Sequence, residues 1–277
     1  MADKAAAKLS GWRGRHLTQA GRVTLTKSVL SSQPVYLLTA LSTTKKVLQS
    51  VDKLRKKFLW AGDDVLTGGK CKVNWQTVNR PLNLGGAGVL DLEKFARALR
   101  LRWLWQEWAT PDKPWVGMGT LCNETDKLLF AASTTLVIGD GTKISFWNSA
   151  WEGGCRPCDL APDVFVISKP KNRSLKEALN GHMWIRDLNL QGHVTVRLLE
   201  QFVTVWEFAQ NVQLDECALD KIIWRWTASG EYSTSSAYRA QYFGSVKSEL
   251  KPLIWKPWAP QKCKFFAWLV IKNSVDL

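Results

Sequence analysis

The clearest pattern of apolar and polar positions lies in residues 42–62, where apolar side chains return at steps of three and four. This spacing is the stripe of an amphipathic helix that buries one face. Ser42 or Thr43 can cap the first turn, and Gly62 stands where helices commonly end in a left-handed residue. We therefore predict a helix here, with a stripe formed by Val47, Leu48, Val51, Leu54, Phe58 and Leu59.

The remaining positions of this predicted helix are strongly basic, and Asp52 is its one acidic residue. The basic residues are Lys45, Lys46, Lys53, Arg55, Lys56 and Lys57. One interpretation is an ordinary solvated face, whose cations near the helix C-terminus complement the helix dipole. The other is a surface that binds an anion, and the charge of the whole chain has to decide between them.

Other helices are predicted along the chain. A second basic helix runs from its N-cap Thr18 to about Ser32, where Pro34 breaks or kinks the path, and Arg22 and Lys27 keep it basic. The further predicted helices are 91–108, which begins at Asp91 and is rich in tryptophan, 194–209, a short helix capped by Ser235 and Ser236, and 263–271. The helix over 91–108 has so wide an apolar arc that it belongs inside a bundle or at a partner surface.

Two stretches have the turn residues and alternation of β-hairpins. Residues 134–147 are predicted to form strand, Gly-Asp-Gly turn and strand, and residues 220–233 form the second hairpin. Residues 110–115 break the helical region and mark a domain boundary, and residues 152–172, rich in Gly, Pro and Asp, are predicted to be loop. The expected fold class is mainly α with small β-hairpins, an α+β chain.

Charge is concentrated near the N-terminus. Residues 1–110 carry 19 basic and 7 acidic residues, whereas the other 167 residues carry 19 and 17. Such an asymmetry favours a sequence-independent attraction to phosphate, because each neutralised phosphate releases counterions. An acidic protein surface or a membrane headgroup layer would be served by the same charge, and RNA or DNA is the preferred partner.

Length and patterning limit the remaining possibilities. A chain of 277 residues with 45% hydrophobic composition predicts about two domains. The sequence has neither an apolar run long enough to span a bilayer nor the apolar core of a secretory signal. We expect a nuclear or cytoplasmic protein that is not secreted.

The cysteines give little sign of a site. Only Cys155 and Cys158 form a C-x-x-C pair among six cysteines, and no second pair follows to complete four zinc ligands. The pair lies in a predicted loop rather than at the strand-to-helix turn that redox chemistry uses. We expect no metal and no cofactor. Most of the sixteen tryptophans are expected to lie in the core.

The chain contains six motif-like stretches, which are L-T-Q-A-G-R-V-T-L-T-K-S-V-L (17–30), V-D-K-L-R-K-K-F-L-W-A-G (51–62), K-C-K-V-N-W-Q-T-V-N-R-P-L-N-L-G-G-A-G-V-L-D-L (70–92), I-G-D-G-T-K-I-S-F-W-N-S-A-W (138–151), W-R-W-T-A-S-G-E-Y-S-T-S-S-A-Y (224–238) and I-W-K-P-W-A-P-Q-K-C-K-F-F-A-W-L (254–269). In the same order, these stretches resemble the region that follows the catalytic palm in plant LINE-type (non-LTR) retrotransposon reverse transcriptases. Asn79, Leu82 and Ser149 stand where the family pattern has Cys, Lys and Asp.

The resemblance implies three parts. They are a basic helical thumb-like module over 1–110, a connecting region with a β-hairpin over 111–215, and the beginning of the family's reverse transcriptase zinc-binding domain over 216–277. The family's zinc ligands follow the position of Leu277, so we expect this chain to lack them. Polymerase chemistry in the family needs a Tyr/Phe-x-Asp-Asp carboxylate set for two magnesium ions, and this sequence has no such motif.

The sequence therefore indicates a chain without catalytic activity. Asp63 and Asp64 are predicted to lie in a solvated loop rather than in a metal site. The predicted function is sequence-independent binding of RNA or DNA by the residues Arg22, Lys27, Lys45, Lys46, Lys53, Arg55, Lys56 and Lys57. The alternative is an inactive retroelement remnant, or a scaffold that binds a protein partner through its tryptophan-rich helices, and no membrane contact is expected.

Overall fold

The computed structural model describes residues 16–62, 71–116, 118–151, 154–190 and 194–272. Asp63 and Asp64 lie outside these residues. The described chain is mainly helical with one two-stranded sheet, which confirms the expected fold class. It divides into two compact units: the first unit contains residues 1–123 and 234–277, and the second unit contains residues 124–233. The three-part division inferred from the sequence stays a prediction.

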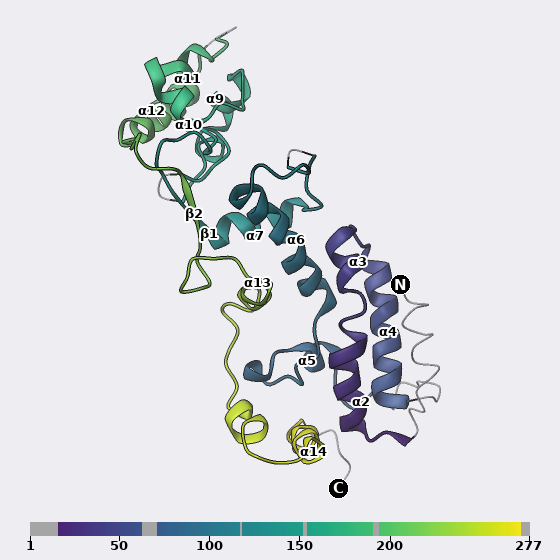
Figure 1. Ribbon diagram of the computed structural model, residues 1–277. Helices are drawn as coiled ribbons and strands as arrows, with labels where there is room; N and C mark the ends of the chain where they lie inside the picture. The colour runs from purple at the N-terminus through teal and green to yellow at the C-terminus, as the bar shows by residue number, and fades with distance from the viewer. Residues whose placement is uncertain (1–15, 63–70, 117, 152–153, 191–193, 273–277) are drawn as a thin grey trace. The chain divides into compact units, whose positions relative to one another are not determined.

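The first unit is built around α4, which spans Lys45–Ala61 and ends at Gly62 with a φ of 65°, as predicted. The prediction that Ser42 or Thr43 caps its first turn is wrong, because the N-cap is Thr44, whose side chain makes no capping hydrogen bond. Figure 1 shows α4 beside α2, and α3 against α6. The helical elements of this unit are α2 (Gln19–Leu25), the π-helix η2 (Thr26–Leu30), α3 (Val35–Ala40), α4, α5 (Trp75–Asn79), η4 (Leu82–Leu84), α6 (Leu92–Ala109), α13 (Thr234–Ala240), the π-helix η6 (Lys251–Trp255) and α14 (Gln261–Ile271).

Several predicted helix ends are confirmed. The Thr18 side chain accepts a hydrogen bond from the Gly21 backbone N–H, and Asp91 caps α6 in the same way. Pro34 interrupts the path as expected, and the chain then continues as α3. The prediction that Ser235 and Ser236 cap a helix is wrong, because both lie inside α13.

Helix α4 takes part in two hydrophobic clusters, one at each half. Leu48 and Val51 pack with residues of α3 and α6 around Leu38. Leu59 and Trp60 belong to a second cluster, whose other members are Ala20, Val23, Val73, Val78, Ala87, Val89, Ile254, Phe265, Trp268 and Leu269. The C-terminal segment of the chain is therefore part of the same core as the N-terminal helices.

The second unit has short helices around an aromatic cluster. Phe146 lies 5.6 Å from Trp184 and 5.0 Å from Trp147 between ring centroids, and all three side chains are almost fully buried. The elements of this unit are α7 (Glu124–Ser133), β1 (Thr134–Val137), α8 (Pro157–Leu160), α9 (Pro162–Ile167), α10 (Leu175–Leu179), η5 (Asn180–His182), α11 (Met183–Arg186), α12 (Val196–Gln210) and β2 (Lys221–Trp224). The predicted helix over 194–209 is confirmed, whereas 152–172 is not all loop because α8 and α9 form within it.

The two predicted hairpins are not formed. Strand β1 pairs antiparallel with β2, and Thr134 lies opposite Trp224. Residues 143–147 contact the start of α10 and the residues before it instead of turning back on β1, since Phe146 N–H donates to Arg173 O and Leu175 N–H donates to Ile144 O. Each predicted hairpin thus supplies one strand to a long-range pair.

Candidate nucleic-acid interface

The exposed basic residues of the first unit include a line of three lysines on α4. Lys46, Lys53 and Lys57 are all exposed, and their spacing of seven and four residues places them on one face of the helix. Lys45 is also exposed, one residue before this line. The structure therefore brings together four of the eight residues predicted to contact nucleic acid.

Lys56 differs from these lysines because it is partly covered. Its Nζ lies 5.6 Å from the ring centroid of Trp75, at the start of α5, and the Arg55 guanidinium carbon lies 5.5 Å from the same ring. A cation at this distance is attracted by the face of an indole. Lys56 therefore packs along the edge of the basic face instead of extending freely from it.

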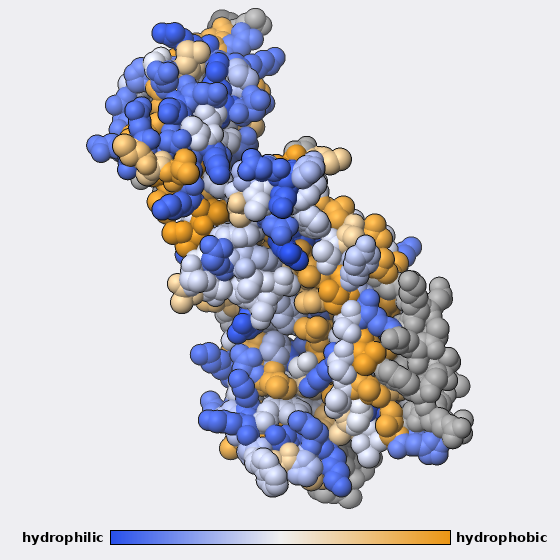
Figure 2. Space-filling model, in the orientation of Figure 1, coloured by the Kyte–Doolittle hydropathy of each residue, from blue (hydrophilic) through white to orange (hydrophobic). Residues whose placement is uncertain are grey.

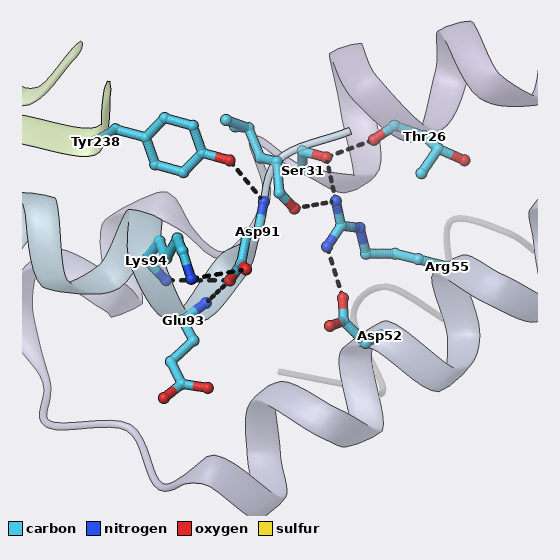
Figure 3. A network of polar contacts seen from close by, with 9 residues as sticks. Thr26, Ser31, Asp52, Arg55, Asp91, Glu93, Lys94 and Tyr238 are labelled. Carbon is cyan, nitrogen blue, oxygen red and sulfur yellow. Dashed lines mark hydrogen bonds and ion pairs between the residues drawn. The ribbon is translucent and has the colours of Figure 1, made fainter. Parts of the chain in front are cut away.

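The prediction that Arg55 lies on the solvent-facing basic surface is wrong, because its side chain is only 1% exposed. Its Nη1 donates to Asp52 Oδ1 at 2.6 Å, and its Nη2 donates to Ser31 Oγ at 2.9 Å and to Leu90 O at 2.8 Å (Figure 3). The planar guanidinium thus joins α4 to the segment after η2 and to the residues just before α6.

The same polar network continues toward α13. The Asp91 backbone N–H donates to Tyr238 Oη at 3.1 Å. The Asp91 carboxylate accepts from the Glu93 and Lys94 backbone N–H groups, both at 3.1 Å, and so caps α6 (Figure 3). Gln241 then donates to Lys94 O at 2.8 Å. These contacts hold residues 234–242 against α6.

Burial dominates the electrostatics of this network. Desolvation raises the pKa of Asp52, although the charge and hydrogen bond of Arg55 oppose it, and desolvation lowers the pKa of Arg55. Desolvation likewise raises the pKa of Tyr238 and of Tyr242. These shifts are typical of groups that serve the packing of a protein rather than the binding of a polyanion at its surface.

Arg22 and Lys27 are both half-buried rather than fully exposed. The Lys27 Nζ lies 5.6 Å from the ring centroid of Trp255, and burial lowers the pKa of Lys27 to about 8. A Cβ atom at Gly88 would lie 3.7 Å from this Nζ. Lys27 therefore faces the contact between the N-terminal helices and the C-terminal segment, which is a poor position for a phosphate.

A polar hollow of about 730 Å³ lies between α5, α6 and the residues after α13. Its charged lining consists of two basic residues, Arg80 and Lys94, and two acidic residues, Asp91 and Glu93. The Lys94 Nζ lies 5.3 Å from the Tyr242 ring centroid. Because the charges in the lining balance, the hollow offers no net attraction to phosphate.

The two units differ sharply in charge. The first unit carries 27 basic and 10 acidic residues, a formal net charge of +17, and the second unit carries 11 basic and 14 acidic residues, a net charge of −3. The C-terminal part of the first unit contributes to this excess, because residues 234–277 alone carry 7 basic and 2 acidic residues. The charge seen near the N-terminus is therefore joined by a second basic stretch in the same unit.

The second unit contains a polar site that the sequence did not reveal. The Asp220 carboxylate is 7% exposed and accepts hydrogen bonds from the backbone N–H groups of Gly139, Gly141 and Lys143, at 2.8, 3.0 and 2.9 Å. The Gly-Asp-Gly turn thus forms a nest around a carboxylate of its own chain. Because Asp220 lies 77 to 81 residues away, no local signal could have found this pairing.

Cys158 of the C-x-x-C pair shows no sign of activation. Its thiol is in no disulfide, and desolvation together with the Asp159 charge raises its pKa. Reactive thiols have lowered pKa values. Among the described residues, no group of three or more His, Cys, Asp or Glu side chains is placed to hold a metal ion.

Two tryptophans of α6, Trp103 and Trp105, pack within the first unit. Trp105 is buried, and the Trp103 Nε1 donates to Thr39 O at 3.0 Å while its ring meets Trp115 edge-on at 4.9 Å. None of the helices in the described part of the chain is both long and apolar enough to cross a membrane.

Comparisons with known proteins give two matches. Residues 232–277 match a family model described as zinc-binding in reverse transcriptase. The chain is also 24% identical over 321 aligned positions to an Arabidopsis thaliana protein named "Putative ribonuclease H protein", covering 99% of this chain and 48% of that protein. The chain thus spans about half the length of this relative. No solved structure matches the chain.

The matched C-terminal stretch does not itself fit a zinc ion. A structural zinc site uses four cysteine or histidine ligands, and residues 232–277 contain one cysteine, Cys263, and no histidine. No step in the function of this chain is therefore assigned to zinc. What the two matches support is a retrotransposon-related chain whose C-terminal part is similar to a reverse transcriptase zinc-binding domain.

Proposed function

We propose that the first unit binds RNA or DNA without reading base sequence, with Lys46, Lys53 and Lys57 contacting the phosphates. The single observation that carries this proposal is the exposed line of these lysines in a unit of net charge +17. They are separated by about 10 and 6 Å along the helix axis. Three and two base-pair steps of a duplex, at 3.4 Å each, span about the same distances.

The expected mode of binding follows from the residue type. Lysine is a compact point charge on a flexible stem, so it neutralises a phosphate without demanding one geometry. Phosphate contacts position a nucleic acid but carry no sequence information. Arg55 is excluded from this surface by its burial, and Lys27 by its packing beside Trp255.

The origin and catalytic status of the chain are part of the same proposal. The six ordered sequence stretches support descent from a plant LINE-type element, in which the first unit would correspond to the thumb-like region. We also propose that the chain has no polymerase activity of its own. The sequence supports this by lacking a Tyr/Phe-x-Asp-Asp motif, which the family uses to hold its metal ions.

A second candidate function, a protein-interaction scaffold, is favoured by one feature of α12 in the second unit. Val196, Leu199 and Val203 recur at steps of three and four and are 73, 53 and 50% exposed. Exposed apolar rows of this kind are typical of surfaces that bind other proteins. On this alternative the chain is a retroelement remnant that contacts proteins and has no nucleic-acid activity.

The test is fluorescence anisotropy of labelled single-stranded RNA, an RNA hairpin and duplex DNA, titrated with the purified chain at several salt concentrations. The variant Lys46→Glu/Lys53→Glu/Lys57→Glu is compared with Lys143→Glu/Lys169→Glu/Lys221→Glu, which changes three exposed lysines of the second unit. Both variants have the same net charge, so they differ only in where the charge is changed.

We expect the α4 variant to reduce the slope of log K against log salt by about 0.7–0.9 for each phosphate that is no longer neutralised. The second-unit variant is expected to keep nearly the slope of the wild-type protein. Equal reductions in the two variants would mean that only total charge matters. No binding by the folded wild-type protein would favour the scaffold.

A further inference from the structure

The C-terminal segment 251–272 combines basic and aromatic residues. It contains five lysines, three tryptophans and no acidic residue. Figure 2 shows mostly hydrophilic side chains over this part of the first unit, around η6 and α14 at the foot of the view. Two of its tryptophans face inward: Trp268 is fully buried and donates to Gly85 O at 3.0 Å, and Trp255 lies beside Lys27.

The third tryptophan, Trp258, is 100% exposed. It lies in the bend between η6 and α14, and Pro257 and Pro260 stand on either side of it. Because proline restricts the backbone, the indole is presented by a segment with little freedom to lose on binding a ligand. A large aromatic side chain that is held out in this way contributes nothing to the packing of the unit.

The charges beside Trp258 indicate the kind of ligand. Lys256 and Lys262 are both exposed and lie two and four residues from it. The nearby Lys264 is used inside the protein, since its Nζ donates to Trp255 O at 3.2 Å. An exposed indole between two exposed cations fits a ligand that is flat, aromatic and anionic at its edges.

We propose that Trp258, with Lys256 and Lys262, is a stacking platform for an unpaired base of single-stranded RNA or DNA. Every base has a π-face, so stacking on an indole tolerates any sequence, while the lysines neutralise the neighbouring phosphates. This inference rests on the proposed function of the first unit. It adds a preference for single strands, which the lysines of α4 alone do not provide, because a duplex keeps its bases stacked.

An experiment with three variants tests the platform. Trp258→Ala removes the indole, Trp258→Phe keeps an aromatic ring, and Leu253→Ala removes another exposed apolar side chain, 68% exposed, from the same segment. Each is titrated by anisotropy against a single-stranded RNA, a single strand of the same length that is abasic at every position, and a duplex. Both substituted side chains are exposed, so the unfolding midpoints are expected to stay at the wild-type value.

The proposal predicts that Trp258→Ala weakens binding of the intact single strand by roughly fivefold or more, and that Trp258→Phe recovers most of this affinity. Leu253→Ala is expected to bind like the wild type. Duplex binding should change less than twofold, and the abasic strand should bind the wild type and Trp258→Ala alike.

Two results would overturn the platform while leaving the α4 lysines in place as a binding surface. One is wild-type affinity of Trp258→Ala for the intact single strand in the presence of a normal salt slope. The other is an equal weakening on intact, abasic and duplex ligands, which would show that no base is stacked. Absence of any binding by the wild-type chain would overturn the platform and the proposed function together.

Discussion

The two units of this chain are stabilised by different kinds of contact. In the first unit, a charged side chain lies in the interior, where the buried Arg55 joins three segments through a polar network. In the second unit, the centre is aromatic, with Phe146 and Trp184 stacked at 5.6 Å. The first unit also has a net charge of +17 against −3. This difference in charge is the reason why we place the proposed nucleic-acid surface on the first unit alone.

The largest expected effect on this comparison comes from the aromatic centre of the second unit. Trp184→Ala removes a side chain that is 1% exposed, and such truncations cost about 3–5 kcal/mol. We expect urea unfolding followed by near-UV circular dichroism to show this destabilisation. Salt-dependent binding of RNA, measured below the unfolding transition, should stay at the wild-type value. A parallel decrease in RNA binding would contradict the separate roles of the two units.

Replacement of Arg55 should have the next largest effect. Arg55→Met leaves the carboxylate of Asp52, the Ser31 hydroxyl and the Leu90 carbonyl without their guanidinium partner, and breaking a buried pair costs about 3 kcal/mol or more. Urea unfolding measures the destabilisation, with Lys53→Met, an exposed position on the same helix, as the matched control. A change no larger than that of the control would mean that the network does not stabilise the first unit.

We expect Lys27 to make the unfolding free energy of the first unit vary with pH in the alkaline range. Its pKa in the folded protein is about 8, below the ordinary value of 10.5, so between these values the unfolded chain binds more protons than the folded one. Stability contributed at this position therefore rises as the pH rises from about 8 to about 10.5.

We expect the difference in unfolding free energy between the wild type and Lys27→Met to shift by on the order of 1–3 kcal/mol in favour of the wild type over this range. Comparing the two proteins cancels the titration of other groups. A difference that is flat with pH would show that Lys27 is not desolvated.

Asn79 gives the smallest expected effect. It is 6% exposed, and its Oδ1 is buried without a hydrogen-bond partner in the described structure. An unpaired buried oxygen costs about 1–3 kcal/mol, and the family pattern has cysteine at this position. Asn79→Cys is therefore expected to raise the unfolding free energy by about 1 kcal/mol. A lower midpoint in thermal denaturation would indicate that the amide has a partner in solution.

The sequence predicted the long helices of the first unit because their apolar residues repeat with a helical period. It misplaced Arg55 because the predicted stripe counted apolar residues only. The structure buries Leu48, Val51 and Phe58 of that stripe together with Arg55, and leaves Val47 37% exposed. The burial of an arginine on such a stripe can be predicted only when its polar partners in other segments of the chain are known.

Long-range pairing explains the errors in the second unit. The chain does bend at the Gly-Asp-Gly stretch, but the N–H groups of both glycines bind Asp220, and the strand before the bend pairs with β2. Neither the pairing with Asp220 nor the pairing with β2 is indicated by the residues next to it in the sequence. The exposure of the α4 lysines could be predicted from helical spacing, whereas the half-burial of Lys27 depends on Trp255, more than two hundred residues away.

The most direct test of the central claim, that the first unit alone contacts nucleic acid, is a lysine footprint. The wild-type chain is acylated with and without saturating single-stranded RNA, and each lysine is quantified by mass spectrometry. We expect Lys46, Lys53 and Lys57 to be protected by the RNA, while Lys143 and Lys169 of the second unit react equally in both samples. Equal protection in both units, or protection confined to the second, would contradict the claim.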